Sequence, residues 1–326
     1  MKRMLILAAA LLIPSAAAHA ESLVALTLSG SAAAGPTNNL VAFDSATPGT
    51  TTTTAVTGLL AGDRLIGIDV RPATNILYGV GTQFITDAND PMVGNSTGIA
   101  RIYTINVATG VATLASTLAA DPADNVAPNP FTSLSGAFFG VDFNPVVDRL
   151  RVVSDTGQNL RINVSTGLTQ LDVAVAYAAA DANAGSPPQV IASAYTNSVN
   201  GAGATSLFAL DAALSTLATQ NPANNGTLNT VDIASSSVFA DAGFDISGQT
   251  GIGYVVLDGI TLATIALTSG GPATGVVVTE VGAINTVGSV TGLAVLPGVI
   301  PEPATGALMG CAGVATVFVR RRARRR

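Results

Sequence analysis

Residues 139–167 read FGVDFNPVVDRLRVVSDTGQNLRINVSTG, and this stretch predicts three short strands joined by two tight turns. Phe139, Val141 and Phe143 are separated by single residues, the period of two that a strand with one buried face requires. An Asn-Pro pair ends the first strand, because proline has no amide hydrogen to donate. An Asp-Thr-Gly turn ends the second, since aspartate and glycine accept turn dihedral angles. The stretch therefore predicts an antiparallel meander.

Weaker copies of this unit recur on both sides of it. The copies of its first and third strands lie at residues 66–72, 243–246, 292–297 and 102–110. About five units fit between residues 23 and 297. A repeat made of short strands is typical of a β-propeller, in which each blade buries its faces against its neighbours. We therefore expect an all-β fold, a propeller of about five four-stranded blades.

The order of the end pieces predicts that the ring is closed. The chain begins with the later strands of a unit, residues 23–28 and 40–44, and returns to a first strand at residues 292–297. Pairing of these N- and C-terminal strands would complete one blade. An open β-sandwich is the alternative. Within the most divergent unit, residues 207–217 have the propensity of a short helix, but alignment with the other units favours strands.

The first 20 residues are typical of a signal peptide. Two basic residues precede a short apolar segment, and Ala18 and Ala20 provide the small residues of a cleavage site. We expect export and a mature chain that begins at Glu21. A transmembrane anchor is the alternative, but the apolar segment is short for a bilayer.

This processing would leave the domain, residues 21–298, without histidine or cysteine. His19 is the only histidine, and the only cysteine, Cys311, lies in the C-terminal tail. Disulfides, thiolate or imidazole metal sites and mechanisms based on either residue are then excluded. Residues 21–300 contain 19 acidic residues, six arginines and no lysine, a net charge of −13. Such a surface repels phosphate, so we expect no nucleic-acid partner.

A long hairpin at residues 82–98 carries Asp87, Asn89 and Asp90. Closely spaced oxygen ligands of this kind are typical of calcium sites, and calcium is the one cofactor that the sequence suggests. The alternative is that these residues only form turns, because no glutamate follows to complete a calcium loop.

Asp69, Asp142 and Asp245 share one position of the repeat, so a closed ring would place them at equivalent points. They could hold a cation or polarise a water in a central channel. Alternatively, each accepts hydrogen bonds from backbone amides of a turn or of the next blade. Repetition favours this structural interpretation, because catalytic sites are normally asymmetric.

Arg149, Arg151 and Arg161, half of the arginines in the domain, lie within 13 residues. Guanidinium groups bind carboxylates and sulfates, so these residues are the candidate ligand site, and an anionic polysaccharide is the candidate ligand. The alternative is that they pair with Asp148, Asp155 or groups of a neighbouring blade.

The C-terminal tail, residues 299–326, has three elements in order. Pro301, Glu302 and Pro303 precede an apolar segment, and six of the last seven residues are arginines. An apolar segment followed by basic residues is typical of a membrane stop. The tail resembles a PEP-CTERM sorting signal. That resemblance implies transient insertion in the inner membrane, processing by an exosortase near the tripeptide, and delivery to the cell surface or exopolysaccharide matrix.

Several longer motifs occur in the body of the chain. They are DFNP at residues 142–145, DRLRVVSDTGQNLR at 148–161, DANAG at 181–185, AYTN at 194–197 and NNGTL at 224–228. A chain with these motifs resembles a bacterial family known as domain of unknown function 4394. The resemblance implies a propeller-like domain and gives no catalytic residues to transfer.

Two classes of function remain. One is a noncatalytic surface or matrix protein that binds exopolysaccharide or a surface protein. The other is a secreted carbohydrate-active or lactone-hydrolysing propeller enzyme that uses carboxylates, with or without calcium. An enzyme would need an asymmetric pair of carboxylates with separated pKa values, whereas the acids here are repeated or lie in turns. We therefore expect a binding or structural protein.

Overall fold

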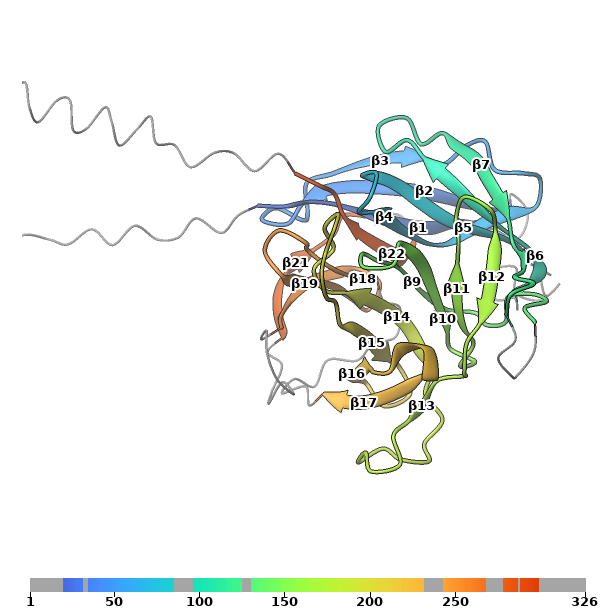
Figure 1. Ribbon diagram of the computed structural model, residues 1–326. Helices are drawn as coiled ribbons and strands as arrows, with labels where there is room; N and C mark the ends of the chain where they lie inside the picture. The colour runs from blue at the N-terminus through green and yellow to red at the C-terminus, as the bar shows by residue number, and fades with distance from the viewer. Residues whose placement is uncertain are drawn as a thin grey trace, which may run out of the picture. The chain divides into compact units, whose positions relative to one another are not determined.

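The computed structural model describes residues 20–31, 35–84, 96–124, 130–231, 243–267, 278–286 and 288–298. In these ranges the chain forms five β-sheets arranged as the blades of a propeller (Figure 1), which confirms the predicted fold. The chain divides into two units, Met1–Leu296 and Pro297–Arg326. Of the second unit only residues 297 and 298 are described.

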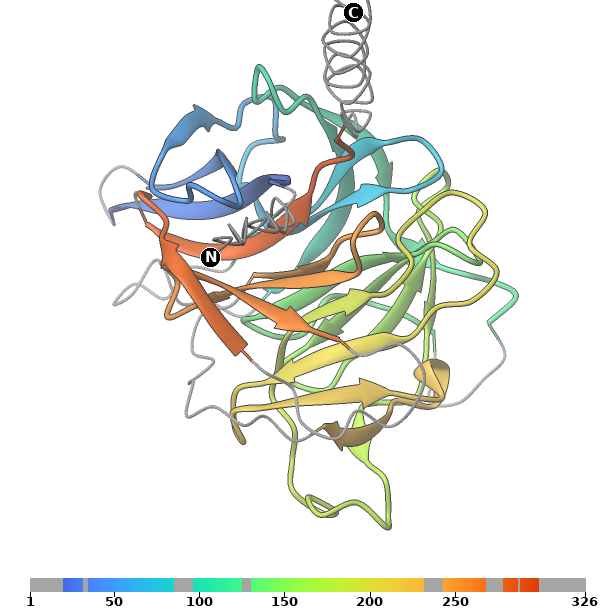
Figure 2. The same ribbon diagram turned by 90° about the vertical axis from the view of Figure 1, so that its left-hand side faces the viewer.

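Blade 1 joins the two ends of the propeller. From the axis outward it consists of β22 (Ser289–Val295), β1 (Ser22–Ser31), β2 (Gly35–Asp44) and β3 (Thr51–Ala55). The pairing of β22 with β1 is antiparallel, with Ala294 opposite Val24. Figure 2 shows the red C-terminal strand beside the blue N-terminal strands. The ring is therefore closed as predicted.

The other four blades follow in chain order. Blade 2 consists of β4 (Asp63–Arg71), β5 (Ile76–Phe84), β6 (Ser96–Ile105) and β7 (Ala112–Thr117). Blade 3 consists of β9 (Phe139–Asn144), β10 (Arg149–Ser154), β11 (Asn159–Ile162) and β12 (Leu168–Leu171), with the short strand β8 (Ala119–Ala120) parallel to β12. Blade 4 consists of β14 (Val190–Tyr195), β15 (Leu207–Asp211), β16 (Thr216–Gln220) and β17 (Thr227–Val231). The short strand β13 (Ala176–Tyr177) is parallel to β17, and a 3-10 helix, η1 (Ala223–Asn225), lies between β16 and β17. Blade 5 consists of β18 (Phe244–Ile246), β19 (Ile252–Leu257), β20 (Thr261–Ala266) and β21 (Val278–Ala283). Residues 207–217 thus contain strands and a turn, as the repeat alignment predicted.

Glycine lets the innermost strands approach one another at the axis. A Cβ atom at Gly140 of β9 would lie 2.5 Å from the backbone nitrogen of Ser193 in β14. At the equivalent Gly67 of β4 it would lie 2.4 Å from the side chain of Val141. This close approach is the physical reason that glycine recurs two residues before the repeated aspartate.

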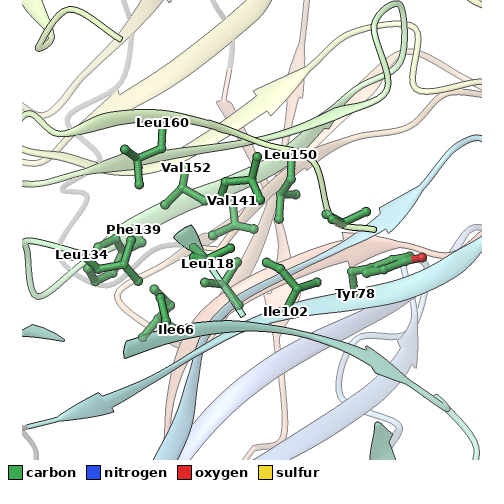
Figure 3. Packing of buried hydrophobic residues seen from close by; sticks show 14 of the residues in the cluster. Ile66, Tyr78, Ile102, Leu118, Leu134, Phe139, Val141, Leu150, Val152 and Leu160 are labelled. Carbon is green, nitrogen blue, oxygen red and sulfur yellow. The ribbon is translucent and has the colours of Figure 1, made fainter. Parts of the chain in front are cut away.

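Apolar side chains fill the interface between blades 2 and 3. Figure 3 shows Ile66 and Ile102 of blade 2 facing Val141, Leu150 and other buried residues of blade 3. At one end of this cluster the rings of Tyr78 and Phe143 meet edge to face, with centroids 5.4 Å apart. Burial of such side chains, at about 25 cal/mol per Å² of apolar surface, is the main force that holds neighbouring blades together.

In the ranges that the structure describes, no helix is both long and apolar enough to cross a membrane.

Candidate functional site

Asp69, Asp142 and Asp245 meet at the axis of the propeller. They lie on β4, β9 and β18, all three are buried, and one carboxylate oxygen of each lies within 4.8 Å of the others. The sequence placed them at equivalent points, and the closed ring brings those points together.

Each of the three carboxylates accepts a hydrogen bond from a backbone amide of the next blade. Asp69 Oδ2 accepts from Phe143 N at 2.7 Å, Asp142 Oδ1 from Tyr195 N at 3.1 Å, and Asp245 Oδ2 from Val295 N at 2.6 Å. The innermost strands of blades 3, 4 and 1 are thereby tied to their predecessors. Buried amides need such partners, so this contact is the structural role that repetition favoured.

Two blades lack the aspartate, and the same carboxylates compensate for it. Alanine stands at the equivalent positions of β14 and β22, Ala194 and Ala294. Because the side chain of alanine cannot accept a hydrogen bond, the amides of Ile246 and Val70 in the following blades need another acceptor. Each donates to Oδ1 of the aspartate that precedes it in the sequence, Asp245 or Asp69, at 2.6 Å. Three carboxylates therefore bind one amide from each of the five innermost strands.

Burial raises the pKa of all three carboxyls, and repulsion from neighbouring carboxylates, Glu21 in the case of Asp245, adds to the shift. The pKa of Asp69 and of Asp142 lies well above its usual range, first because of burial and then because of neighbouring carboxylates. Burial raises the pKa of Asp245 to about 7. A hydrogen bond between the carboxyls of Asp142 and Asp245 raises the pKa of the former and lowers that of the latter, as expected when Asp142 carries the proton.

The axial carboxylates are also a donor set that a cation could use. Three oxygens within one coordination sphere suit a hard cation such as calcium. However, five of their six oxygens already accept backbone amides. The arrangement therefore fits both an ion and a shared proton.

The second candidate site is a cavity of about 420 Å³ on blade 3, facing blade 4. Arg149, Arg151 and Arg161 all line it, together with Tyr195 and Asn224 of blade 4. Arg151 and Arg161 are direct cross-strand neighbours on β10 and β11. The hairpin therefore brings together the arginines that the sequence singled out.

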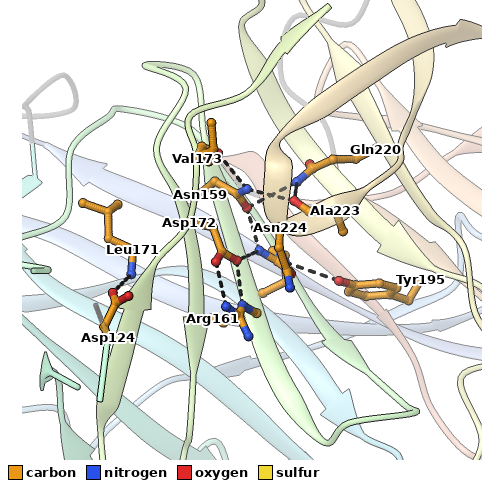
Figure 4. Close-up of polar contacts among 11 residues, drawn as sticks. Asp124, Asn159, Arg161, Leu171, Asp172, Val173, Tyr195, Gln220, Ala223 and Asn224 are labelled. Atoms are coloured by element: carbon orange, nitrogen blue, oxygen red, sulfur yellow. Dashed lines mark hydrogen bonds and ion pairs between the residues drawn. The ribbon is translucent and has the colours of Figure 1, made fainter. Parts of the chain in front are cut away.

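Asp172, just after β12, holds two of these arginines in place. Its Oδ2 accepts from Arg151 Nη1 at 2.6 Å and from Arg161 Nε at 2.7 Å, and its Oδ1 accepts from Arg161 Nη2 at 2.8 Å (Figure 4). The ion pair raises the pKa of Arg161. Arg151, only 2% exposed, also donates to Asn159, Asn224 and the hydroxyl of Tyr195.

The predicted pairing with Asp148 and Asp155 is wrong. Asp148 forms an ion pair with Arg71 of blade 2, and this contact lowers the pKa of Asp148. Asp155 accepts the amides of Ala137 and Phe138, because it lies in the turn after β10. Only the expectation of partners in a neighbouring blade is confirmed, through Tyr195 and Asn224.

Arg149 differs from the other two arginines. Its side chain is exposed, and its Nη1 donates to the backbone carbonyls of Asp148, at 3.1 Å, and Val147. Among the ion pairs of the described residues, none includes Arg149. It is therefore the guanidinium of the cavity that is best placed to bind an anion.

The polar side chains that line the cavity mainly offer hydrogen-bond donors. Oδ1 of Asn144 accepts the Val146 amide, and Oδ1 of Asn163 accepts the Ser165 amide. Oδ1 of Asn224 accepts from Arg151. Because each oxygen is in use, the amide nitrogen of each side chain is the group that can still donate to a ligand. The lining therefore suits a ligand rich in oxygen acceptors.

The arginines interrupt the repeat. A cross-strand row that starts at the axial position reads Asp142, Arg151, Arg161 and Gln170 in blade 3. The same row reads Asp69, Tyr78, Thr104 and Thr113 in blade 2, and Asp245, Tyr254, Thr264 and Thr279 in blade 5. It reads Ala194, Phe208, Thr219 and Asn229 in blade 4, and Ala294, Val24, Ala42 and Thr52 in blade 1. In this row only blade 3 has charged side chains beyond the axial position, which gives the cavity the asymmetry expected of a ligand site.

Sequence reasoning missed Asp172 and Arg71. Asp172 N donates to the carbonyl of Asn159. A hairpin drawn about the turn at residues 163–168 would therefore have predicted that Asp172 lies opposite Asn159, beside the two arginines. No such local signal marks Arg71, because its contact with Asp148 joins residues 77 positions apart.

Several predicted sites lie outside the described residues. These are the calcium candidates Asp87, Asn89 and Asp90, the cleavage residue Ala18, and the tripeptide Pro301, Glu302 and Pro303. They remain predictions. Two further groups of Asp and Asn residues, at positions 121–125 and 181–183, contain Asp121 and Asp181, which the structure describes. Each of these aspartates accepts a hydrogen bond from the backbone amide two residues further on, as turn-forming residues do.

Comparisons with known proteins give weak structural matches and one clear family. The chain is similar to the major allergen Mala s 1 of Malassezia sympodialis, with 10% identity, a TM-score of 0.39, and coverage of 74% of this chain and 72% of that one. It is also similar to YCF48 bound to a D1 peptide, with 12% identity, a TM-score of 0.32, and coverage of 76% and 66%. Among curated proteins nothing matches. The model of the family described as Domain of unknown function (DUF4394) matches residues 39–294, and the chain therefore belongs to this family.

Proposed function

We propose that this protein is a noncatalytic binding propeller that captures an anionic ligand in the cavity of blade 3. The observation that carries the proposal is the convergence of Arg149, Arg151 and Arg161 on one cavity, at positions where the other blades have uncharged residues. At about 420 Å³ the cavity lies within the range of roughly 300–1,000 Å³ that is typical of small-molecule sites.

The place of action in this proposal is the bacterial cell surface or the exopolysaccharide matrix. The signal pattern that ends at Ala20 supports export, and the tail with Pro301, Glu302 and Pro303 supports sorting by an exosortase. An anionic exopolysaccharide is then the ligand that the protein would meet. Calcium has no place in this binding step, because the cavity offers its positive charge through arginine.

The acids around the cavity support binding rather than hydrolysis. In the described part of the chain, Asp121 is the one carboxylate that lines the cavity, and it accepts the Ala123 amide. The nearby Asp172 accepts three hydrogen bonds from two arginines. Carboxylate-based glycoside hydrolysis uses two carboxyl groups on opposite sides of the scissile bond, whereas here Asp172 is engaged by two arginines.

The test is retention of the purified protein, as its host exports it, on immobilised acidic exopolysaccharide and on a neutral polysaccharide of similar size. New reducing ends are measured in the same samples. We expect retention on the acidic polymer, weaker retention as salt is raised, and no new ends.

A matched pair of variants separates the cavity from the overall charge. Arg149→Gln removes a positive charge from the cavity, and Thr52→Glu makes the same change in net charge on the exposed strand β3 of blade 1. We expect loss of retention only for Arg149→Gln. Equal behaviour of the two variants would contradict the cavity as the site, and release of new ends would contradict the noncatalytic role.

A further inference from the structure

We infer that the cavity of blade 3 recognises a sugar residue that carries a single negative charge, and that the Arg71–Asp148 ion pair keeps Arg149 available for it. This inference rests on the proposed function and narrows it from anionic ligands in general to a monoanionic sugar acid.

The charges around the cavity set the charge of the ligand. Asp172 offsets one of the two positive charges of Arg151 and Arg161. Asp124 acts electrostatically on Arg161 and Asp121 lines the cavity, so the second charge is offset as well. The wall therefore has at most one uncompensated positive charge, that of Arg149. A ligand charge that enters the cavity is favourable only when it is paired, so one anionic group fits opposite Arg149 and the second charge of a dianion is left without a partner.

The uncharged hydrogen-bond donors of the cavity indicate which other groups the ligand carries. The amide nitrogens of Asn144, Asn163 and Asn224 surround the guanidinium groups. The hydroxyl of Tyr195 accepts from Arg151 and can donate its own hydrogen. Neutral donors of this kind bind hydroxyl and ring oxygens, and the apolar side chains of Val147 and Leu168 provide surface for the C–H groups of a sugar ring.

The ion pair with Arg71 explains why Arg149 is left without a carboxylate. Asp148 is its neighbour in the sequence and would be its natural partner. However, Asp148 has φ of 52°, a left-handed conformation, and its carboxylate binds the guanidinium of Arg71 on β4, with Arg71 Nε 2.8 Å from Oδ1. Arg149 is then left with backbone carbonyls as acceptors. Arg71 thus acts as a positioning residue, in blade 2, for a site in blade 3.

The first experiment measures the dissociation constants of four hexoses of similar size by titration calorimetry. They are glucuronate and glucose 6-sulfate, each with one negative charge, glucose 6-phosphate, with about two, and uncharged glucose. We expect one of the two monoanions to bind at least about tenfold more tightly than glucose and glucose 6-phosphate, since charge-assisted hydrogen bonds are stronger than neutral ones. The stronger of the two identifies carboxylate or sulfate ester as the natural group.

The second experiment tests the positioning role with the preferred monoanion. In Arg71→Gln, Asp148 is free to pair with Arg149, and we expect binding to weaken roughly three- to tenfold. Adding Asp148→Asn removes the competing carboxylate, and asparagine tolerates a positive φ, so we expect the double variant to recover binding to within about twofold. A purely structural role of Arg71 would give no such recovery.

The outcomes separate this inference from the function on which it rests. Equal binding of glucose, or tightest binding of glucose 6-phosphate, overturns the monoanion inference, and so does an absence of monosaccharide binding when the polymer is still retained through Arg149. Unchanged binding in Arg71→Gln, with native melting temperature, overturns the positioning role. Failure of both the monosaccharides and the polymer overturns the proposed function as well.

Discussion

Tyr78 and Arg151 occupy equivalent positions on neighbouring blades, and the interfaces that they face are opposite in character. Tyr78 meets the ring of Phe143, and the gap between blades 2 and 3 is filled by apolar side chains (Figure 3). Arg151 meets Tyr195, Asp172 and Asn224, and this part of the gap between blades 3 and 4 is polar (Figure 4). At the axis both interfaces have the same contact, in which a backbone amide of the following blade donates to an aspartate of the preceding one.

The difference shows where the fold leaves room for a function. Both interfaces hold their blades together, so stability does not require a buried arginine. A buried ion pair is often no more stable than apolar side chains of the same volume. We therefore interpret the polar row of blade 3 as retained for ligand binding, and the following experiments test this contrast between the two interfaces.

The largest expected effect comes from the glycines beside the axis. In Gly140→Ala the new methyl group meets the backbone of Ser193, which cannot move aside, and we expect a loss of about 3–4 kcal/mol in the free energy of unfolding. In Gly67→Ala it meets only the side chain of Val141, so we expect a loss of about 1–2 kcal/mol. Urea unfolding measures both. Val141→Ala should recover part of the loss in Gly67→Ala, and equal losses in the two single variants would contradict this account.

A smaller effect is expected from the equivalent pair Arg151 and Tyr78. Arg151→Met leaves Asp172, Asn159 and Asn224 with fewer donors, and we expect it to lower the free energy of unfolding by about 3 kcal/mol. Tyr78→Phe removes only a long hydrogen bond from Arg71, and we expect a loss of less than about 1 kcal/mol. Thermal unfolding of the two variants side by side gives the comparison. A loss for Tyr78→Phe as large as that for Arg151→Met would contradict it.

The pH dependence of stability tests the axial contact that the interfaces share. The folded pKa of each axial carboxyl is raised, so its contribution is present below the unfolded pKa of about 4 and is lost as the pH rises through the folded pKa, about 7 for Asp245. We expect the free energy of unfolding to fall between pH 5 and pH 8. In Asp142→Asn the amide keeps both hydrogen bonds and cannot ionise. We expect a shallower fall, and a gain of about 1–2 kcal/mol over the wild type at pH 8.

Parallel pH profiles of the wild type and Asp142→Asn would contradict a shared proton at the axis. They would instead favour an ion that keeps all three carboxylates charged throughout this range.

The smallest expected effect is that of chelation. Because backbone amides already donate to five of the six axial carboxylate oxygens, we expect EDTA to change the melting temperature at pH 7 by less than about 1 °C. A larger drop that calcium reverses, and that disappears in Asp142→Asn, would establish an axial ion. A drop that persists in Asp142→Asn would point to Asp87, Asn89 and Asp90 instead.

The sequence predicts the ring and its axis well because both depend on local repetition. The Gly-x-Asp pattern of Gly140 and Asp142 recurs in blades 2 and 5, where the innermost strand likewise approaches its neighbour and accepts an amide from the next blade. The arginines could be grouped for the same reason, since Arg151 and Arg161 belong to one hairpin.

The partners of those arginines in blade 4, Tyr195 and Asn224, could not be predicted by counting residues. Irregular pairing shifts the register within blade 2, at residues 65–67, and within blade 4, at residues 190–192. The equivalence of Tyr78 and Arg151 survives both shifts, because each lies nine residues after its aspartate, whereas Phe208 of blade 4 lies 14 residues after Ala194. The contact of Arg71 with Asp148 joins two blades, so it depends on the closed ring rather than on any local pattern.

The position of β22 has a consequence for the order of folding. The innermost strand of blade 1 is supplied by residues 289–295, and Val295 donates the amide that Asp245 accepts. A ribosome therefore releases nearly the whole domain before the ring can close. Until then β1 presents an unpaired edge and Asp245 lacks the amide of Val295, and the contacts that close the ring are the most distant along the chain. The first blade of such a chain is therefore the last to be completed.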